Sequence, residues 1–291
     1  MKDTLLRALA MDENIRVYGL NATQAVKEAK TRHDTYNGGT IALGKTLMAG
    51  LLLGGTLKGE DKLTIKVQGD GILGAIVVDS DAKGHVKGYV KNPHVYIQPD
   101  ENMRPSLPAT IGKNGILTVI KDLGLKEAFS GQVPLVAGDI SQDITYYMAS
   151  SEQVPSAVSL CVNLDEDGEV ISAGGFMLQV LPGASEEVIS AVENSLQQAE
   201  DFAKALAKGI SPAEYLKTLV GELVILDEMP VEFLCDCSKE KFGQAIIALG
   251  EKEITEMIEE DHGAEAVCQF CNNHYHYSEE DLIALRNEAM A

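Results

Sequence analysis

Residues 233–242 read FLCDCSKEKF, and residues 268–271 read CQFC. The chain has 5 cysteines in 291 residues, and four of them fall into these two tight pairs. Zinc prefers a tetrahedral set of thiolates, and two short cysteine pairs from separate loops are the usual way to supply one. The pairs therefore predict a zinc-binding unit near the C-terminal end of the sequence.

The candidate ligands are the four paired cysteines: Cys235, Cys237, Cys268 and Cys271. The first pair has a single intervening residue, which is fewer than zinc fingers usually have. Three histidines lie close enough in sequence to replace a cysteine: His262, His274 and His276. We expect an all-thiolate zinc site and keep a histidine-substituted site as the alternative.

The remaining cysteine and histidines show no recognisable site. Cys161 lies in the apolar run VSLCVN and is expected to be an inert buried residue. His33, His85 and His94 have no visible partner in the sequence, so we interpret them as structural or surface residues.

The composition is that of an acidic globular protein. Apolar residues make up 45% of the chain and charged residues 23%, which is ordinary, but the net charge is -20. Nucleic-acid affinity comes largely from Lys and Arg side chains, so this charge argues against nucleic acid and against anionic membranes as partners. Residues 232–291 contain 14 acidic and 4 basic side chains, so about half of the net charge lies in a compositionally separate final segment.

The sequence predicts a cytoplasmic protein. Charges interrupt the first twenty residues before any apolar run of signal-peptide length, and TLMAGLLLGGTL at residues 46–57 is too short to cross a bilayer. Cytosolic thiols are normally kept reduced, so a static disulfide framework is not expected. Metal binding or redox chemistry is the better account of paired cysteines.

The first 181 residues combine helical and β-rich segments. Residues 40–55, TIALGKTLMAGLLLGG, predict a buried helix. Residues 62–90 contain short β-rich runs separated by GDG and DSDAKG turns, which predict an antiparallel meander. Further strands and one helix are expected at residues 115–122, 131–138, 139–153, 156–164 and 169–181. The fold class is therefore α+β, with an antiparallel-sheet N-terminal domain over residues 1–181.

Helical signals replace the β pattern from residue 182 onward. Ser185, followed by acidic residues, begins a helix that we expect to end at Gly209. Pro212 lies just inside the start of another helix. Residues 182–230 are therefore interpreted as a helical linker.

Residues 231–291 form the third predicted unit, a C-terminal zinc-binding domain that ends in a helix from Ser278 to Met290. A unit of about 60 residues is marginal on its own core, so a metal must supply much of its folding free energy. Structural zinc contributes about 10–16 kcal/mol in small peptides. Each cysteine pair could also close its own disulfide once zinc leaves, so a static structural site and a redox sensor both stay open.

Residues 39–46, GTIALGKT, match the phosphate-loop pattern through Gly39, Gly44, Lys45 and Thr46. Asp79, at the end of AIVVD, could serve as the magnesium partner of such a loop. The preceding stretch KEAKTRHDTYNG is too polar for the buried strand that a phosphate loop must follow, and Asp79 lies in an antiparallel pattern. We therefore expect core packing here rather than nucleotide binding.

Four stretches together resemble one protein family, and they span essentially the whole chain. CDCSKEKF with CQFC resembles the C-terminal redox-switch motif of the 33 kDa chaperonin family, the redox-regulated heat-shock holdases. AKTRHDTYNGGTIALGKTLMAGLLLG is similar to the early helical segment of that family, and GGFMLQVLPGA to the end of its N-terminal domain. GQVPLVAGDISQDITYYMASSEQVPSAVSLCV resembles its central stretch.

The resemblance implies a mechanism. In the reduced, inactive form the four paired cysteines would hold zinc. Oxidation would produce the disulfides Cys235–Cys237 and Cys268–Cys271 and release the zinc. The helical linker would then loosen and expose apolar surface that captures unfolded or misfolded client proteins without ATP, and the active form would be a homodimer.

Other function classes compete with this stress-activated binding protein. Nothing in the sequence resembles a nucleophile, base and orienting group, so we do not expect an enzyme. A thiol oxidoreductase would use the C-x-x-C at Cys268, but AVCQFCNNHYHY lacks the thioredoxin-like βαβ setting of such motifs. A zinc module that docks nucleic acid or protein is the third class: the charge argues against nucleic acid, and a protein-docking module should not respond to oxidant.

Overall fold

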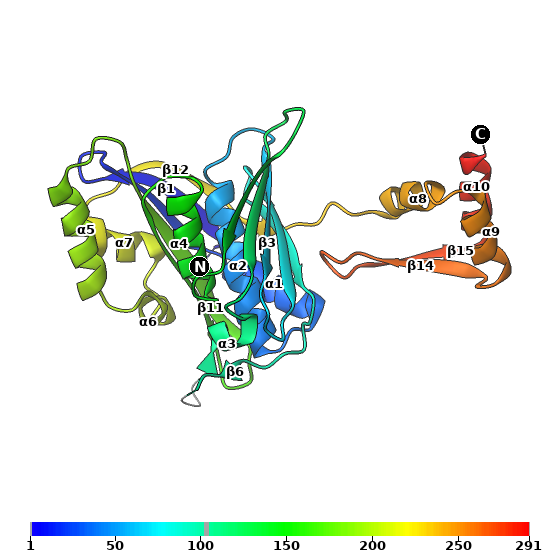
Figure 1. The fold of residues 1–291 in the computed structure, drawn as a ribbon, viewed down its shortest axis with the longest axis horizontal. Coiled ribbons are helices and arrows are strands. Elements are labelled where there is room, and N and C mark those ends of the chain that lie inside the picture. Colours follow the sequence, from blue (N-terminus) through cyan, green and yellow to red (C-terminus); the bar gives the residue numbers. More distant parts are fainter. Residues whose placement is uncertain (1, 102–104, 291) are drawn as a thin grey trace. The chain divides into compact units, whose positions relative to one another are not determined.

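The computed structural model describes residues 2–101 and 105–290. Within them the chain forms two compact units that divide between Leu234 and Cys235 (Figure 1). The first unit contains a five-stranded and a six-stranded sheet with packed helices, and the second contains helices and one two-stranded hairpin. This mixed architecture confirms the α+β class predicted from the sequence.

The five-stranded sheet is antiparallel throughout, in the order β10-β11-β2-β1-β12. Its strands are β1 (Thr4–Ala10), β2 (Ile15–Asn21), β10 (Ser156–Leu164), β11 (Val170–Val180) and β12 (Val224–Pro230). The predicted pairing of β10 with β11 around the DEDG turn is confirmed. The hairpin of β1 and β2 was not foreseen.

The six-stranded sheet has the order β13-β5-β4-β3-β8-β9. Its strands are β3 (Lys62–Gln68), β4 (Ala75–Asp81), β5 (His85–Val90), β8 (Ile116–Asp122), β9 (Phe129–Pro134) and β13 (Glu232–Phe233). The predicted meander is confirmed as β3, β4 and β5. In this sheet only β13 pairs in parallel, along the edge of β5. It ends at Phe233, two residues before Cys235.

Helix α2 (Asn37–Gly54) packs against strands of both sheets and forms the centre of the main core. It is apolar nearly all round, as expected for a helix without a solvent-facing side. Shorter elements of the same unit precede residue 182: α1 (Thr23–His33), α3 (Leu107–Ile111), α4 (Ile140–Ser150), β6 (Gln98–Pro99) and β7 (Pro105–Ser106). The predicted buried helix is thus confirmed.

The stretch that imitates a phosphate loop lies inside α2, so its glycines have a packing role. A Cβ atom at Gly39 would lie 2.6 Å from the Pro93 carbonyl oxygen, and one at Gly44 would lie 2.8 Å from Val26 Cγ1. The Lys45 ammonium pairs with Asp139 at 2.8 Å. Core packing, the interpretation reached from the sequence, is confirmed.

The segment after residue 182 begins with two helices where the sequence predicted one. Ser185 accepts the N–H of Val188 (3.5 Å) and begins α5 (Glu186–Gln198). Asp201 accepts the N–H of Lys204 (3.2 Å) and begins α6 (Phe202–Ala207). The internal carboxylate supplies a second N-cap, which explains why the predicted continuous helix is interrupted.

The rest of this segment is one helix and one strand. Helix α7 (Pro212–Val220) begins as predicted, with a capping box between Ser211 and Glu214. The last seven residues of the predicted helical linker then form β12 and pair with β1. Their VIL sequence favours a strand, and β1 offers a free edge for pairing.

Helices α6 and α7 cover the face of the five-stranded sheet opposite to α2. Side chains alternate along a strand, so Val17 and Phe176 face these helices while Tyr18 and Met177 join the main core. The ring of Phe202 contacts that of Phe176 edge-on at 5.3 Å between centroids. A second apolar cluster is buried in this way beneath the linker.

The C-terminal unit contains three helices and a hairpin: α8 (Lys239–Ile247), α9 (Glu251–Glu259), β14 (Gly263–Val267), β15 (His274–Ser278) and α10 (Glu279–Ala289). The predicted final helix is confirmed, and Ser278 caps it in a capping box with Asp281. The buried core of this unit comprises Ile246, Ile254, Tyr277 and Leu282. Such a core is small for a unit that must stay folded.

None of the helices in the described parts of the chain is long and apolar enough to span a membrane.

Replacing Gly44 with Val tests the packing role of the phosphate-loop-like stretch. The added methyl groups would meet Val26 and Val162, whose nearest atoms already lie within 3 Å of a Cβ at this position. We expect the free energy of unfolding to fall by about 1–3 kcal/mol in urea titrations. Magnesium with ATP should leave the melting temperature of the unsubstituted protein unchanged, and a rise would contradict the packing interpretation.

Candidate metal centre

The first two sulfurs come from an extended arm between β13 and α8. Ser238 begins α8 by accepting the N–H of Lys241 (3.2 Å), which ends the arm one residue after Cys237. The Lys241 ammonium reaches back to the carbonyl oxygen of Asp236 (2.7 Å) and to its carboxylate (2.6 Å). The helix cap and this ion pair fix the path of the C-x-C segment.

The other two sulfurs lie at the tip of the β14–β15 hairpin. The Cys268 N–H donates to the carbonyl oxygen of Asn273 (2.9 Å), and the Asn272 N–H donates to that of Cys268 (2.7 Å). Asn272 adopts a φ of 58°, in the left-handed region that asparagine tolerates better than most residues. This tight knuckle buries Cys268 and Cys271.

The structure brings the four predicted cysteines together, with all four Sγ atoms within 4.8 Å of one another. The Sγ atoms of Cys235 and Cys268 are 3.7 Å apart, and those of Cys237 and Cys271 are 3.3 Å apart. Zinc–sulfur bonds of about 2.3 Å place tetrahedral sulfurs ~3.8 Å from one another. The cluster therefore has the size and the donor set for one thiophilic metal ion.

The ionisation of these sulfurs is coupled to the presence of a cation. Burial raises the pKa of Cys235 to about 11, and burial also raises the pKa of Cys271. Burial opposes ionisation of Cys237 too, but hydrogen bonds led by that of the Tyr275 hydroxyl outweigh it and lower its pKa. Four thiolates so close together need a positive charge among them, and a metal ion would supply it.

The histidines considered as alternative ligands lie outside the cluster that the described residues form. His274 and His276 alternate with the inward-facing tyrosines of β15, so their rings point to the opposite face. Both pair with Glu265, at 3.0 and 3.3 Å. His262 pairs with Glu279 at 2.8 Å. The structure favours the all-thiolate set.

The other cysteine and histidines do not belong to the cluster that the described residues form. Cys161 is buried as predicted, its Sγ donates to the Gly174 carbonyl oxygen (3.5 Å), and burial raises its pKa to about 12. His85 pairs with Asp81 at 2.9 Å and His94 with Asp34 at 3.3 Å, partners that the sequence had not revealed. His33 is half-buried in α1.

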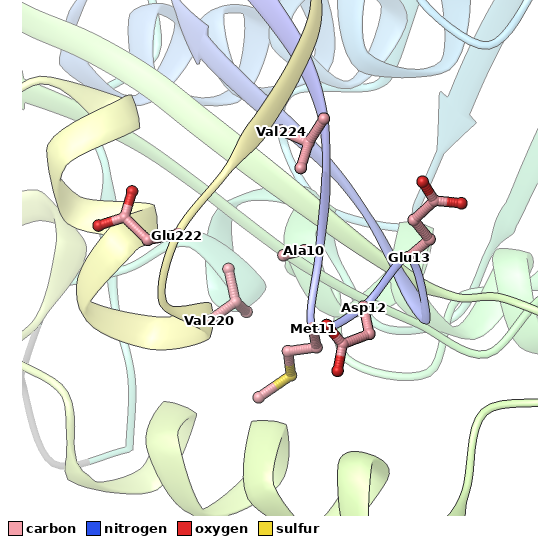
Figure 2. A pocket seen from close by; sticks show the side chains of 7 residues that line it. All are labelled: Ala10, Met11, Asp12, Glu13, Val220, Glu222 and Val224. Carbon is pink, nitrogen blue, oxygen red and sulfur yellow. The ribbon is translucent and has the colours of Figure 1, made fainter.

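A pocket of about 590 Å³ lies in the first unit, between the β1–β2 turn and the connection from α7 to β12 (Figure 2). Its lining is aliphatic and acidic: Ala10, Met11, Asp12, Glu13, Val220, Glu222 and Val224. This lining offers carboxylates but no thiol, hydroxyl, imidazole or amine. The cysteine cluster is therefore the stronger candidate for chemistry.

Comparison with known proteins agrees with the motifs. A family profile described as "Hsp33 protein" matches residues 3–278. The chain belongs to the Hsp33 family. The 33 kDa chaperonin of Enterococcus faecalis is 55% identical over 292 residues, covering 100% of this chain and 98% of that protein. The 33 kDa chaperonin of Bacillus subtilis is 47% identical over 287 residues, covering 98% and 99%.

A solved Hsp33 structure shows the same fold. The crystal structure of the 33 kDa chaperonin from Thermotoga maritima matches with a TM-score of 0.92 at 32% identity, covering 100% of this chain and 99% of that one. The resemblance drawn from the motifs is confirmed. Hsp33 is a chaperonin family and not an enzyme family, which agrees with the lack of a recognisable catalytic set.

Two residues near the metal centre were missed by sequence reasoning. The Tyr275 hydroxyl lies 3.1 Å from Cys237 Sγ, and the Tyr277 hydroxyl donates to the Lys239 carbonyl oxygen. The alternation HYHYS, starting three residues after the last cysteine, was the available signal. It predicts a strand with both tyrosines on one face.

Cobalt(II) titration of the reduced protein tests the donor set. We expect one ion per chain and the visible absorption of tetrahedral thiolate coordination, because four sulfurs converge on one point. Binding should weaken as the pH falls, since the metal must displace thiol protons.

Cys271→Ser should weaken this cobalt binding strongly, whereas Cys161→Ser, which removes a buried thiol outside the cluster, is the matched control and should not. Equal effects of the two substitutions would contradict the assignment.

Proposed function

We propose that this protein is a redox-regulated, ATP-independent holdase that protects unfolding proteins from aggregation during oxidative and heat stress. The observation that supports it most is the convergence of four sulfurs within 4.8 Å in a chain of the Hsp33 family. A chaperonin family implies protein clients, here unfolded or misfolded ones.

Zinc is the proposed metal of the reduced, inactive form, held by Cys235, Cys237, Cys268 and Cys271. An all-sulfur donor set of tetrahedral size suits it. Bound structural zinc contributes about 10–16 kcal/mol in small peptides, which is large beside what a small core supplies. Folding of the C-terminal unit would then depend on the metal.

Oxidation would convert the thiolates to the disulfides Cys235–Cys237 and Cys268–Cys271. Each S–S bond forms as two thiolates give two electrons to a peroxide, whose O–O bond breaks to yield two hydroxide ions. Two peroxides thus oxidise one centre, and zinc leaves because a disulfide is a poor ligand. The Sγ contacts of 3.7 and 3.3 Å given above join sulfurs of different pairs, so the proposed pairing rests on the family resemblance rather than on these distances.

Loss of the folded C-terminal unit would then loosen the predicted linker, residues 182–230, from the N-terminal domain, residues 1–181. Helices α6 and α7 cover apolar side chains of the five-stranded sheet, including Val17, Phe176 and Leu178. Their departure would expose an apolar surface large enough for client capture. Residues 231–291 would act as the switch domain.

A net charge of -20 would keep a partly unfolded, apolar protein in solution. The active form is proposed to be a homodimer. The proposed compartment is the cytoplasm, where thiols stay reduced until an oxidant arrives.

Treating the zinc-loaded protein with peroxide at mildly elevated temperature tests the switch. We expect zinc release, followed with a chromogenic chelator, to accompany suppression of client aggregation measured by light scattering. The reduced protein at the same temperature is the control. Zinc release without gained client binding would leave only a structural zinc site.

Ending the chain after Leu234 tests whether the C-terminal unit restrains the rest. This chain keeps the whole first compact unit and lacks all four paired cysteines. We expect it to suppress client aggregation without oxidant, whereas the full-length reduced chain should not. A truncated chain that is folded by circular dichroism yet binds no client would refute the restraint.

A further inference from the structure

Two tyrosine hydroxyls of β15 bind the backbone where the C-x-C arm leads into α8. The Tyr275 hydroxyl donates to the carbonyl oxygen of Cys237 (3.0 Å), and the Tyr277 hydroxyl donates to that of Lys239 (2.5 Å). Tyrosines two residues apart on one strand face the same side. The two halves of the metal centre are thereby joined through protein atoms as well as through sulfur.

Both rings are held in place by packing. Tyr275 packs against Phe242 of α8, with ring centroids 5.4 Å apart and the ring planes tilted by 36°. Tyr277 is buried in the core of the C-terminal unit, and the Lys239 ammonium lies 5.1 Å from its ring centroid. The hydroxyl positions therefore follow from the fold of this unit.

The two hydroxyls differ in one respect. That of Tyr275 also lies 3.1 Å from Cys237 Sγ, whereas that of Tyr277 binds a backbone oxygen two residues further along. A phenol has one proton, so Tyr275 divides it between the sulfur and the carbonyl oxygen of Cys237. A metal-bound thiolate has no proton to give, so toward it the hydroxyl can act only as a donor.

We propose that Tyr275 is a positioning residue that favours the reduced, metal-bound state of Cys237 and so sets how readily the centre is oxidised. The inference rests on the proposed redox switch and names a residue that regulates it. A hydrogen bond to a charged sulfur is stronger than one to a neutral sulfur, so it stabilises the thiolate more than the disulfide. It also lowers the electron density with which the sulfur attacks peroxide.

Tyr275→Phe, measured in the full-length zinc-loaded protein, tests this role. The variant keeps the ring on Phe242 and removes only the hydroxyl. We expect zinc affinity to fall about tenfold, in the range for lost partners of metal ligands. Zinc release by peroxide should be several-fold faster, as expected for a change of that size.

Tyr277→Phe is the matched control, because it removes a hydroxyl that binds the adjoining backbone, at Lys239 of α8, and not a sulfur. Its peroxide-driven zinc release should stay close to that of the unsubstituted protein. If both variants accelerate release equally, the hydroxyls act only by holding the backbone and the inference is wrong. If Tyr275→Phe changes nothing, it is wrong as well.

Cobalt(II)-loaded protein gives a readout that a merely structural role would not move. Loss of a hydrogen bond makes the thiolate a better electron donor, so the sulfur-to-cobalt charge-transfer band should shift to lower energy in Tyr275→Phe and stay in place in Tyr277→Phe. An unshifted band in Tyr275→Phe overturns the inference.

Incorporation of fluorotyrosine, whose phenol is a stronger donor, covers the case in which Tyr275→Phe does not fold. In the Tyr277→Phe background, where the other hydroxyl of β15 is absent, fluorotyrosine should make peroxide-driven zinc release slower than ordinary tyrosine does. Unchanged or faster release would contradict the proposal. The proposed function fails separately, if the unsubstituted protein releases zinc and gains no client binding.

Discussion

Four sulfur atoms within 4.8 Å of one another cannot all carry a negative charge unless a cation lies among them. As thiolates they repel, and burial raises the pKa of Cys235 and Cys271, which disfavours their ionisation. A cation among them removes both penalties at once. Because the arm and the hairpin meet at these sulfurs, gain or loss of a cation there affects the folding of the whole C-terminal unit.

The two compact units differ in what keeps them folded. The first has helix α2 between two sheets, with a continuous apolar core that no metal needs to complete. The second has a core of a few side chains and carries much of the negative charge of the chain. Loss of the second can therefore leave the first intact, which is the physical requirement for a switch that unfolds one part and keeps the other working.

Local signals predicted the elements that depend on local physics. Ser185, Ser278 and the alternating strands of residues 62–90 were identified from the sequence because caps, turns and side-chain periodicity are encoded within a few residues. The strand β12 was missed because its short VIL run becomes a strand by pairing with the edge of β1, more than two hundred residues earlier in the chain. The cysteines of the centre were found from spacing, whereas Tyr275 depends on tertiary contacts across the hairpin.

The burial of Cys161 has a consequence for the fidelity of thiol chemistry. A fifth thiol on the surface would give an odd number of exchangeable sulfurs, so one of them would have no partner for a disulfide within the chain. With its Sγ hydrogen-bonded to Gly174 inside the sheet and its pKa raised to about 12, Cys161 has almost no thiolate at neutral pH. Cys161 is therefore a poor partner for scrambled or intermolecular bridges. Under the proposed oxidation, the four clustered cysteines would take up oxidising equivalents in whole pairs, which a reductant could later remove completely.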